Sequence, residues 1–233
     1  MSLFERLAEF AGKPVHSASL NVFRCLFGLL VFTEALRFFL HDWIAAYYSD
    51  SKVLFKYPGF EWVSPWPAEW LHLHFSLVAV FALLVALGLF YRLAILGLTL
   101  SFGYVFLLDQ ALYLNQYYLV LTLAFLLCFM PAERGFSLDS LRRGKSLESS
   151  VPRWNITVMR FQLEVMLIYA GLVKLNPDWL QGEPLGLWFS QRSDLPVIGP
   201  WLTTPALAET ASLAVIALHL IGAPLLLVRK TRL

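Results

Sequence analysis

The stretch VMRFQLEVMLIYAGLVKLNPDWLQGEPLGL, residues Val158–Leu187, places a membrane-length apolar segment directly before a turn that contains a proline. Arg160, Glu164 and Lys174 interrupt the apolar run, and at 100° per residue their side chains fall on one stripe of a helix. Ionisable groups at membrane depth cost about a few kcal/mol each, so this stripe is expected to face a protein interior. Pro177 lacks an N–H, and we therefore predict that the helix stops before it, with Lys174 in the last turn near one membrane surface.

The composition of the whole chain is that of an integral membrane protein. Of its 233 residues, 58% are hydrophobic and only 15% are charged, and the mean hydropathy is +0.64. In a soluble domain about a quarter of the residues are charged. Nothing in the composition indicates binding to nucleic acid. Cys25 and Cys128 lie in apolar segments without the spacing of a metal or redox motif, so we interpret both as packing residues.

The apolar segments predict an all-α, polytopic transmembrane helix bundle of about six spans, formed by a single domain over residues 1–233. Residues 1–15 are interrupted by charged side chains and are predicted to form an amphipathic helix at the membrane interface. Residues 131–157 are predicted to form a basic cytoplasmic loop. The six predicted spans are Ser19–Leu40, Leu71–Phe90, Leu93–Leu108, Tyr113–Met130, Val158–Leu175 and Leu207–Val228.

Basic residues give the orientation of these spans, because Lys and Arg are retained on the cytoplasmic side of a membrane. With both termini cytoplasmic, the inner segments hold eleven basic residues, whereas the outer loops hold only Lys52, Lys56 and Arg192. This orientation brings several polar groups to the outer ends of the spans. They are Lys174 of the fifth span, Asn115 and Gln116 of the fourth, and Glu34 and Arg37 of the first.

The two longer outer segments, residues 41–70 and 176–205, are rich in Trp, Pro and Gly. Each Trp fits the role of an interface anchor, and together the two segments are expected to cover a pocket that opens outward. His72 and His74 are two residues apart, which places them on different faces of a helix, and no third ligand is evident. We therefore predict no metal site.

Four stretches, in order along nearly the whole chain, carry a family resemblance. They are ASLNVFRCLFGLLVF from Ala18, GLFYRLAILGL from Gly88, YVFLLDQALYLNQYYLVLTLAFLLCFMPAERGFSLDSL from Tyr104, and VPRWNITVMRFQLEVMLIYAGLVKLNPDWLQGEPL from Val151. The chain resembles the transmembrane part of the vitamin K-dependent gamma-glutamyl carboxylases and of the wider HTTM (horizontally transferred transmembrane) family.

The resemblance implies a catalytic lysine. The run AGLVKLNPDW, Ala170–Trp179, matches the family pattern A-G-x-x-K-L-[DN]-x-D-W, which maps the family's general base onto Lys174. In that family the lysine deprotonates reduced vitamin K, a hydroquinone. Oxygen and carbon dioxide are co-substrates, the quinone leaves as an epoxide, and a protein glutamate is carboxylated. The resemblance implies the same epoxidase and carboxylase (lyase) chemistry here, without a metal.

One family position differs in this chain. A histidine follows an asparagine at the start of the fourth span in the family, but here Asn115 is followed by Gln116. Glutamine can hydrogen-bond to an oxygen of the quinone but cannot carry the charge of an imidazolium. His41, at the outer end of the first span, is a candidate for the missing imidazole. The predicted quinone pocket therefore contains Asn115, Gln116, Trp179 and His41.

Alternatives stay open at several of these residues. Lys174 also fits a lysine at a helix end whose amine reaches the membrane surface. Arg160 and Glu164 fit an intrahelical charge pair, or Glu164 fits a partner of Arg24 in the first span, better than a catalytic site. The competing function is a non-catalytic membrane bundle that binds quinone or lipid. A transporter is less favoured, because no paired broken helices are evident.

The resemblance also implies partners and a location. Family members continue into further spans and a large outer domain, so we expect either a glutamate-containing protein substrate or a second chain that supplies these parts. Membrane lipid and quinone are the expected small-molecule partners. The expected location is the bacterial inner (plasma) membrane, with the site facing outward.

Overall fold

The computed structural model describes residues 2–50, 53–144 and 149–227. These residues are mostly helical, which confirms the all-α prediction. They form two compact units, Met1–Met159 and Arg160–Leu233. The boundary between the units falls inside the long helix α7 (Arg153–Leu172).

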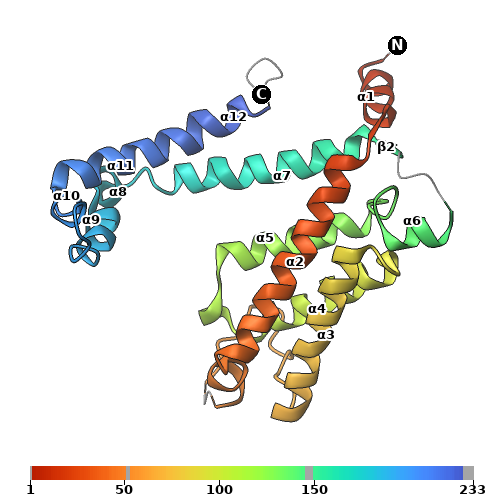
Figure 1. Cartoon of the computed structure of the whole chain (residues 1–233), viewed down its shortest axis with the longest axis horizontal. Coiled ribbons are helices and arrows are strands. Elements are labelled where there is room, and N and C mark those ends of the chain that lie inside the picture. The colour runs from red at the N-terminus through yellow and green to blue at the C-terminus, as the bar shows by residue number, and fades with distance from the viewer. Residues whose placement is uncertain (1, 51–52, 145–148, 228–233) are drawn as a thin grey trace. The chain divides into compact units, whose positions relative to one another are not determined.

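The first unit is a bundle in which helices that follow one another in the chain pack side by side (Figure 1). The connections over residues 88–90 and 109–114 are short, which favours antiparallel packing of the helices that they join. Gly28 allows its helix to approach the helix that contains Ala86, because a Cβ at position 28 would lie 2.5 Å from the backbone nitrogen of Ala86. The four helices are α2 (Ala18–Leu40), α3 (Ala68–Leu87), α4 (Tyr91–Leu108) and α5 (Asn115–Cys128).

The N-terminal residues fold into a short helix and a strand. α1 (Leu3–Gly12) begins with a capping box between Ser2 and Glu5, which agrees with the helix predicted in residues 1–15. β1 (Pro14–His16) then pairs antiparallel with β2 (Ser150–Pro152). The start of the chain is therefore joined to the segment that leads into α7.

The described residues between 131 and 157 contain regular elements within the predicted loop. They contain α6 (Leu138–Arg142), strand β2 and the first residues of α7, which begins five residues before the predicted span. Asp139 of α6 explains part of this regular structure, because its carboxylate accepts hydrogen bonds from the backbone nitrogens of Phe90 (3.1 Å) and Tyr91 (3.0 Å) at the start of α4. These bonds satisfy backbone donors that the helix itself leaves free.

Arg24 binds backbone groups within the first unit. Its side chain is fully buried and donates to the backbone carbonyls of Ala86 (2.7 Å), Phe136 (2.6 Å) and Val85. The guanidinium thus joins α2 to the end of α3 and to the segment before α6. These carbonyls satisfy donors of the buried guanidinium. The predicted pairing of Arg24 with Glu164 joins residues of two different units and stays a prediction.

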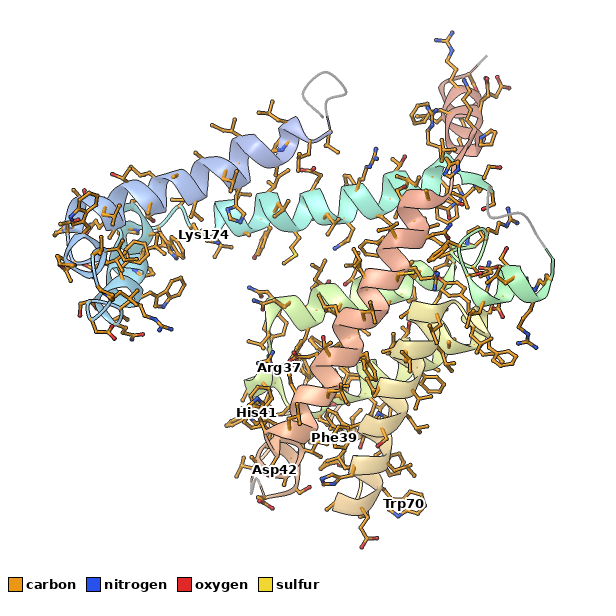
Figure 2. The ribbon with its side chains drawn as sticks, in the orientation of Figure 1. Arg37, Phe39, His41, Asp42, Trp70 and Lys174 are labelled. Carbon is orange, nitrogen blue, oxygen red and sulfur yellow. The ribbon has the colours of Figure 1, made fainter. Side chains whose placement is uncertain are left out.

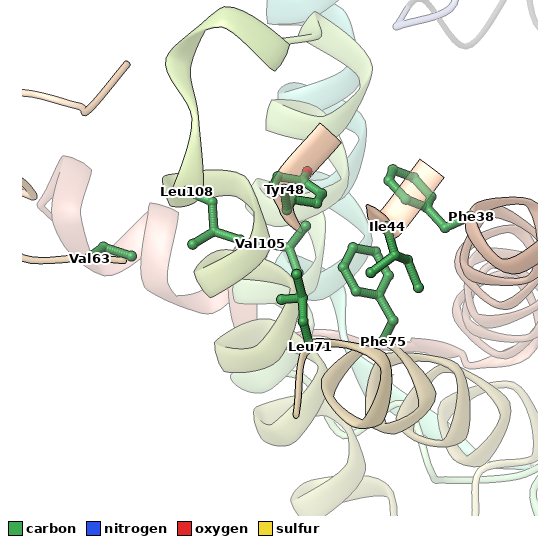
Figure 3. Close-up of a cluster of buried hydrophobic side chains, with 8 residues drawn as sticks. All are labelled: Phe38, Ile44, Tyr48, Val63, Leu71, Phe75, Val105 and Leu108. Atoms are coloured by element: carbon green, nitrogen blue, oxygen red, sulfur yellow. The ribbon is translucent and has the colours of Figure 1, made fainter. Parts of the chain in front are cut away.

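At the other end of the bundle, the segment that follows α2 folds against the ends of α2, α3 and α4 (Figure 3). The side chain of Asp109 accepts a bond from the backbone nitrogen of Phe55 (3.0 Å), so the segment is also fixed by polar contacts. Burial, with Asp109 nearby, raises the pKa of the Tyr48 hydroxyl, which is therefore neutral in this core. The buried cluster consists of Phe38, Ile44, Tyr48, Val63, Leu71, Phe75, Val105 and Leu108.

The second unit contains the end of α7 and a group of shorter helices. Two of them, α8 and α9, pack against α11. Gly182, with a φ of +74°, allows this contact, since a Cβ there would lie 2.6 Å from the backbone nitrogen of Glu209. The helices after α7 are α8 (Pro177–Leu180), α9 (Glu183–Ser190), α10 (Gly199–Leu202) and α11 (Pro205–Ala217).

The last predicted span is a helix with an irregular turn. α11 continues through a π-helical turn, η3 (Leu218–Gly222), into α12 (Ala223–Leu225). Pro224 lies in the first turn of α12, and because it has no N–H it cannot continue the α-helical hydrogen bonds of the preceding turn.

Among the described helices, three are long and apolar enough to cross a membrane: Ala68–Leu87, Tyr91–Leu108 and the run Pro205–Leu225. Asn115–Cys128 is apolar but shorter, since the fourth predicted span loses residues at both ends. The structure thus has helices at all six predicted positions. Six membrane crossings and cytoplasmic termini stay predictions.

Candidate functional site

Lys174 lies in the turn that follows α7, rather than inside the helix as predicted. The helix ends at Leu172, and the backbone nitrogen of Lys174 donates to the carbonyl of Gly171 at 3.1 Å, so the final turn is tightened. This shift has a local cause, because Asn176 must adopt an extended conformation (φ −128°, ψ 162°) before Pro177. The helix therefore ends at Leu172, before the predicted end of the span at Leu175, and leaves Lys174 outside it.

A second helix begins directly after this turn and places an indole beside the lysine. Asn176 is the N-cap of α8, and its side-chain oxygen accepts a bond from the backbone nitrogen of Trp179 at 3.1 Å. The side-chain nitrogen of Asn176 donates back to the carbonyl of Val173 at 2.9 Å. Pro177 occupies the first turn of α8, where a missing N–H costs nothing. The residues of the AGLVKLNPDW run thus form a helix end, a cap and a new helix start.

The amine of Lys174 is half-buried and is held by neutral groups. Its Nζ donates to the carbonyl of Ala170 at 2.9 Å and lies 5.0 Å from the centroid of the Trp179 ring. In the part of the chain that the structure describes, Lys174 takes part in no ion pair. Neither Asp178 nor Glu183, the acidic residues that follow it in sequence, supplies a countercharge.

Two contacts to the last predicted span support this turn. A Cβ at Gly171 would lie 2.6 Å from Cδ2 of Leu220, so glycine allows η3 to approach the end of α7. Ser212 of α11 is fully buried, and its hydroxyl donates to the carbonyl of Trp179. The backbone of Trp179, beside the lysine, is therefore held by Asn176 and by Ser212.

The first unit holds a cavity of about 570 Å³ between α2, the segment after α2, and the start of α5. Its polar edge is a connected group: Glu34 accepts a bond from Arg37 (2.7 Å) and another from the Tyr117 hydroxyl (2.7 Å). Gln116 lies at the same edge. The remaining wall is apolar or aromatic and is formed by Leu30, Val31, Phe38, Trp43, Tyr47, Phe102, Ala111, Leu112, Tyr113, Leu114 and Val120. A mainly apolar cavity of this size with a few polar groups suits a small amphipathic ligand.

A family model described as the HTTM domain matches residues 12–233. The chain belongs to the HTTM domain family. The match covers nearly the whole described chain and confirms the resemblance seen in the four sequence stretches. No solved structure matches this HTTM domain significantly.

Within each unit, the HTTM domain places residues that the sequence assigned to the outer ends of spans beside other functional candidates. Glu34, Arg37 and Gln116 line one cavity, and Lys174 contacts Trp179. Figure 2 shows Arg37 and His41 close together at one end of α2, and Lys174 at the end of α7.

The structure separates Asn115 and His41 from the cavity wall itself. Asn115 is exposed and is the first residue of α5, whereas Gln116 lines the cavity. His41 is also exposed, and its ring stacks on Trp43 with a centroid distance of 4.9 Å and an interplanar angle of 22°. Because Trp43 lines the cavity, His41 stands behind one of its walls.

Sequence reasoning missed Tyr117 and Trp43. A signal for Tyr117 was present, since a hydroxyl at the start of an apolar segment needs a hydrogen-bond partner and Glu34 is the carboxylate of the first predicted span. No comparable indication exists for Trp43, because the sequence does not show which of several Trp residues in an outer segment lines a cavity.

Arg160 and Glu164, which fit an intrahelical charge pair by sequence, lie in different environments in α7. The structure has no ion pair between them: Arg160 is exposed, while Glu164 is 6% exposed and its Oε2 has no hydrogen-bond partner among the described residues. The order of the two residues contributes to this result, because an acidic residue four positions before a basic one pairs better on a helix than the reverse order.

His72 and His74 bind different groups. A ring nitrogen of His72 lies 2.8 Å from the carbonyl of Ala68, and one of His74 lies 2.9 Å from the carbonyl of Ser101. Within the described ranges, no group of three or more His, Cys, Asp or Glu side chains is arranged to hold a metal ion.

Proposed function

We propose that this HTTM domain is a membrane enzyme that takes a proton from a reduced naphthoquinone, with Lys174 as the general base. The observation that carries the proposal is the environment of the Lys174 amine. It is half-buried, positioned by the carbonyl of Ala170 and the ring of Trp179, and has no carboxylate partner among the described residues.

This environment suits a base for two reasons. A neutral amine has two N–H groups and one lone pair, so a bond from one N–H to Ala170 leaves the lone pair free to accept a proton. No carboxylate forms an ion pair with this amine among the described residues, so its second N–H and its lone pair stay available to a substrate. General bases of this kind contribute about 10²- to 10⁴-fold to a rate.

The residues around Lys174 also fit a planar aromatic substrate. Trp179 presents an aromatic ring beside the amine, and its position is set by Asn176 and Ser212. By analogy with the family, the reduced quinone and oxygen would supply the stronger base needed to activate a protein glutamate for carboxylation, and the quinone would leave as its epoxide. The protein's own part in this chemistry is to orient the ring and to hold the proton on Nζ of Lys174.

The test is formation of quinone epoxide by the purified full chain, supplied with a reduced naphthoquinone and oxygen and followed by chromatography. We expect Lys174→Ala to lower epoxide formation by at least about 10²-fold. Lys174→Arg should be equally inactive, because arginine keeps its proton in proteins. Lys13→Ala is the matched control, since it removes an exposed lysine that pairs with Glu9. Epoxide formation by Lys174→Ala at the wild-type rate would refute the assignment.

The cavity of the first unit favours a second candidate function, non-catalytic binding of a quinone or lipid. Its apolar wall and its Glu34, Arg37, Gln116 and Tyr117 edge are complete without Lys174. This function predicts that the wild-type chain binds a naphthoquinone in calorimetry but forms no epoxide. It also predicts that Gln116→Leu weakens binding, while Lys174→Ala leaves binding unchanged.

A further inference from the structure

A second cavity of the first unit, of about 390 Å³, lies at the start of α4, whereas the cavity lined by Gln116 reaches the other end of that helix. Three arginines line it, together with two carboxylates and the apolar first residues of α4. The lining residues are Phe90, Tyr91, Arg92, Leu93, Glu133, Asp139, Arg142 and Arg143.

The two carboxylates of this cavity interact with groups of the protein, although Oε2 of Glu133 is buried without a hydrogen-bond partner among the described residues. Both oxygens of Asp139 accept bonds from the backbone nitrogens of Phe90 and Tyr91. Oε1 of Glu133 lies 3.6 Å from Arg92, and its side chain is only 13% exposed. Arg142 and Arg143 add two positive charges, so the three arginines of the lining outnumber its two carboxylates.

The guanidinium groups of Arg142 and Arg143 are available to a ligand. Arg142 is exposed, and Cζ of its guanidinium lies 4.9 Å from the centroid of the Phe90 ring. Arg143 is exposed and forms no ion pair within the described ranges. Guanidinium groups bind phosphate through paired N–H···O bonds, so an anionic phosphate is the ligand that fits these two side chains.

An exposed apolar stripe begins at the same cavity. Leu93, Leu96 and Leu100 are 71%, 49% and 66% exposed, and their spacing of three and four residues places them on one face of α4. α4 is one of the helices long and apolar enough to cross a membrane. The cavity therefore lies where such a helix begins, and the stripe runs from it toward the hydrocarbon region.

We infer that this cavity binds the phosphate of an anionic phospholipid whose acyl chain lies along the leucine stripe of α4. A free phosphate ion would use the arginines but not the leucines. A zwitterionic lipid would use the leucines but would bring no net negative charge to the arginines. Only an anionic lipid uses both features, and basic pockets at the ends of membrane helices are suited to such headgroups.

The experiment measures the melting temperature of the full chain in an uncharged detergent during titration with dioleoyl phosphatidylglycerol, dioleoyl phosphatidylcholine or inorganic phosphate. We expect only phosphatidylglycerol to raise it. Arg143→Gln should need about fivefold more of this lipid for the same effect, because one arginine near a membrane surface contributes about that factor in affinity.

The matched control is Arg134→Gln, which removes the same charge from an exposed arginine in the segment before α6 but outside the cavity. It should respond to phosphatidylglycerol like the wild type. Because Arg143 forms no ion pair in the described chain, both variants should melt like the wild type without lipid. Equal effects of Arg134→Gln and Arg143→Gln, or equal stabilisation by inorganic phosphate or phosphatidylcholine, would overturn the inference.

Discussion

Replacing Gly28 with alanine tests the closest contact between helices in the first unit. An added Cβ would lie 2.5 Å from the nitrogen of Ala86, 2.6 Å from the carbonyl oxygen of Ala82 and 2.8 Å from Cα of Ala86. All three atoms are backbone, so no side chain can rotate away. Ordinary contacts of a Cβ are about 3.4 Å or longer, and α2 and α3 must therefore separate by about 1 Å.

The size of the effect follows from two opposing terms. Overpacking costs about 1–3 kcal/mol, and a backbone contact belongs at the upper end of that range. Alanine returns about 1 kcal/mol because it favours the helix over glycine. The net loss is about 2 kcal/mol, which corresponds to a decrease of about 4–8 °C in melting temperature for a chain of this length.

Thermal unfolding in detergent, followed with a thiol-reactive fluorophore, measures this decrease, because Cys25 and Cys128 are free and only partly exposed. Gly103→Ala is the matched control within α4, since a Cβ there meets only Cδ1 of Leu121 at an ordinary 3.4 Å. Its melting temperature should stay the same or rise slightly. If Gly28→Ala melted at or above the wild-type temperature, α2 and α3 would not pack as closely as described.

Two further substitutions test other contacts. Arg24→Met should lower the free energy of unfolding by about 3 kcal/mol or more, because three backbone carbonyls each lose a donor. A melting temperature within roughly 2 °C of the wild type would show that these bonds contribute little. Asn176→Ala should remove the cap of α8 at a cost of about 1 kcal/mol and lower epoxide formation by releasing Trp179, whereas Asn176→Ser should keep both. Full activity of the alanine variant would show that the cap does not position the site.

The positions of the helices could be predicted from sequence because long apolar runs and their terminating residues are local signals. The end of α7 illustrates this, since Pro177 fixed it to within a few residues. The exact turn was not predictable from Pro177 alone, because Asn176 acts at the same time as the cap of the next helix. Two adjacent local signals combined to move Lys174 out of the helix.

Polar pairing inside the bundle was less predictable. Opposite charges suggested Arg160 or Arg24 as the partner of Glu164. In the structure Arg24 donates to carbonyl groups of residues more than sixty positions away. Sequence does not show which backbone carbonyls lack a donor until the helices are assembled. For the same reason Glu34, Arg37 and Gln116 could be placed at one end of the bundle, whereas the bond between Glu34 and Tyr117 could not be predicted.

The pairing of Pro14–His16 with Ser150–Pro152 has a practical consequence for dissecting the molecule. This pairing closes the first unit, because segments near both of its ends form the same two-stranded sheet. A fragment intended to carry α2 to α5 alone must therefore extend to Pro152, because cutting after Cys128 would remove the partner strand and, with it, Asp139 and the carbonyl of Phe136 that complete the far end of the bundle.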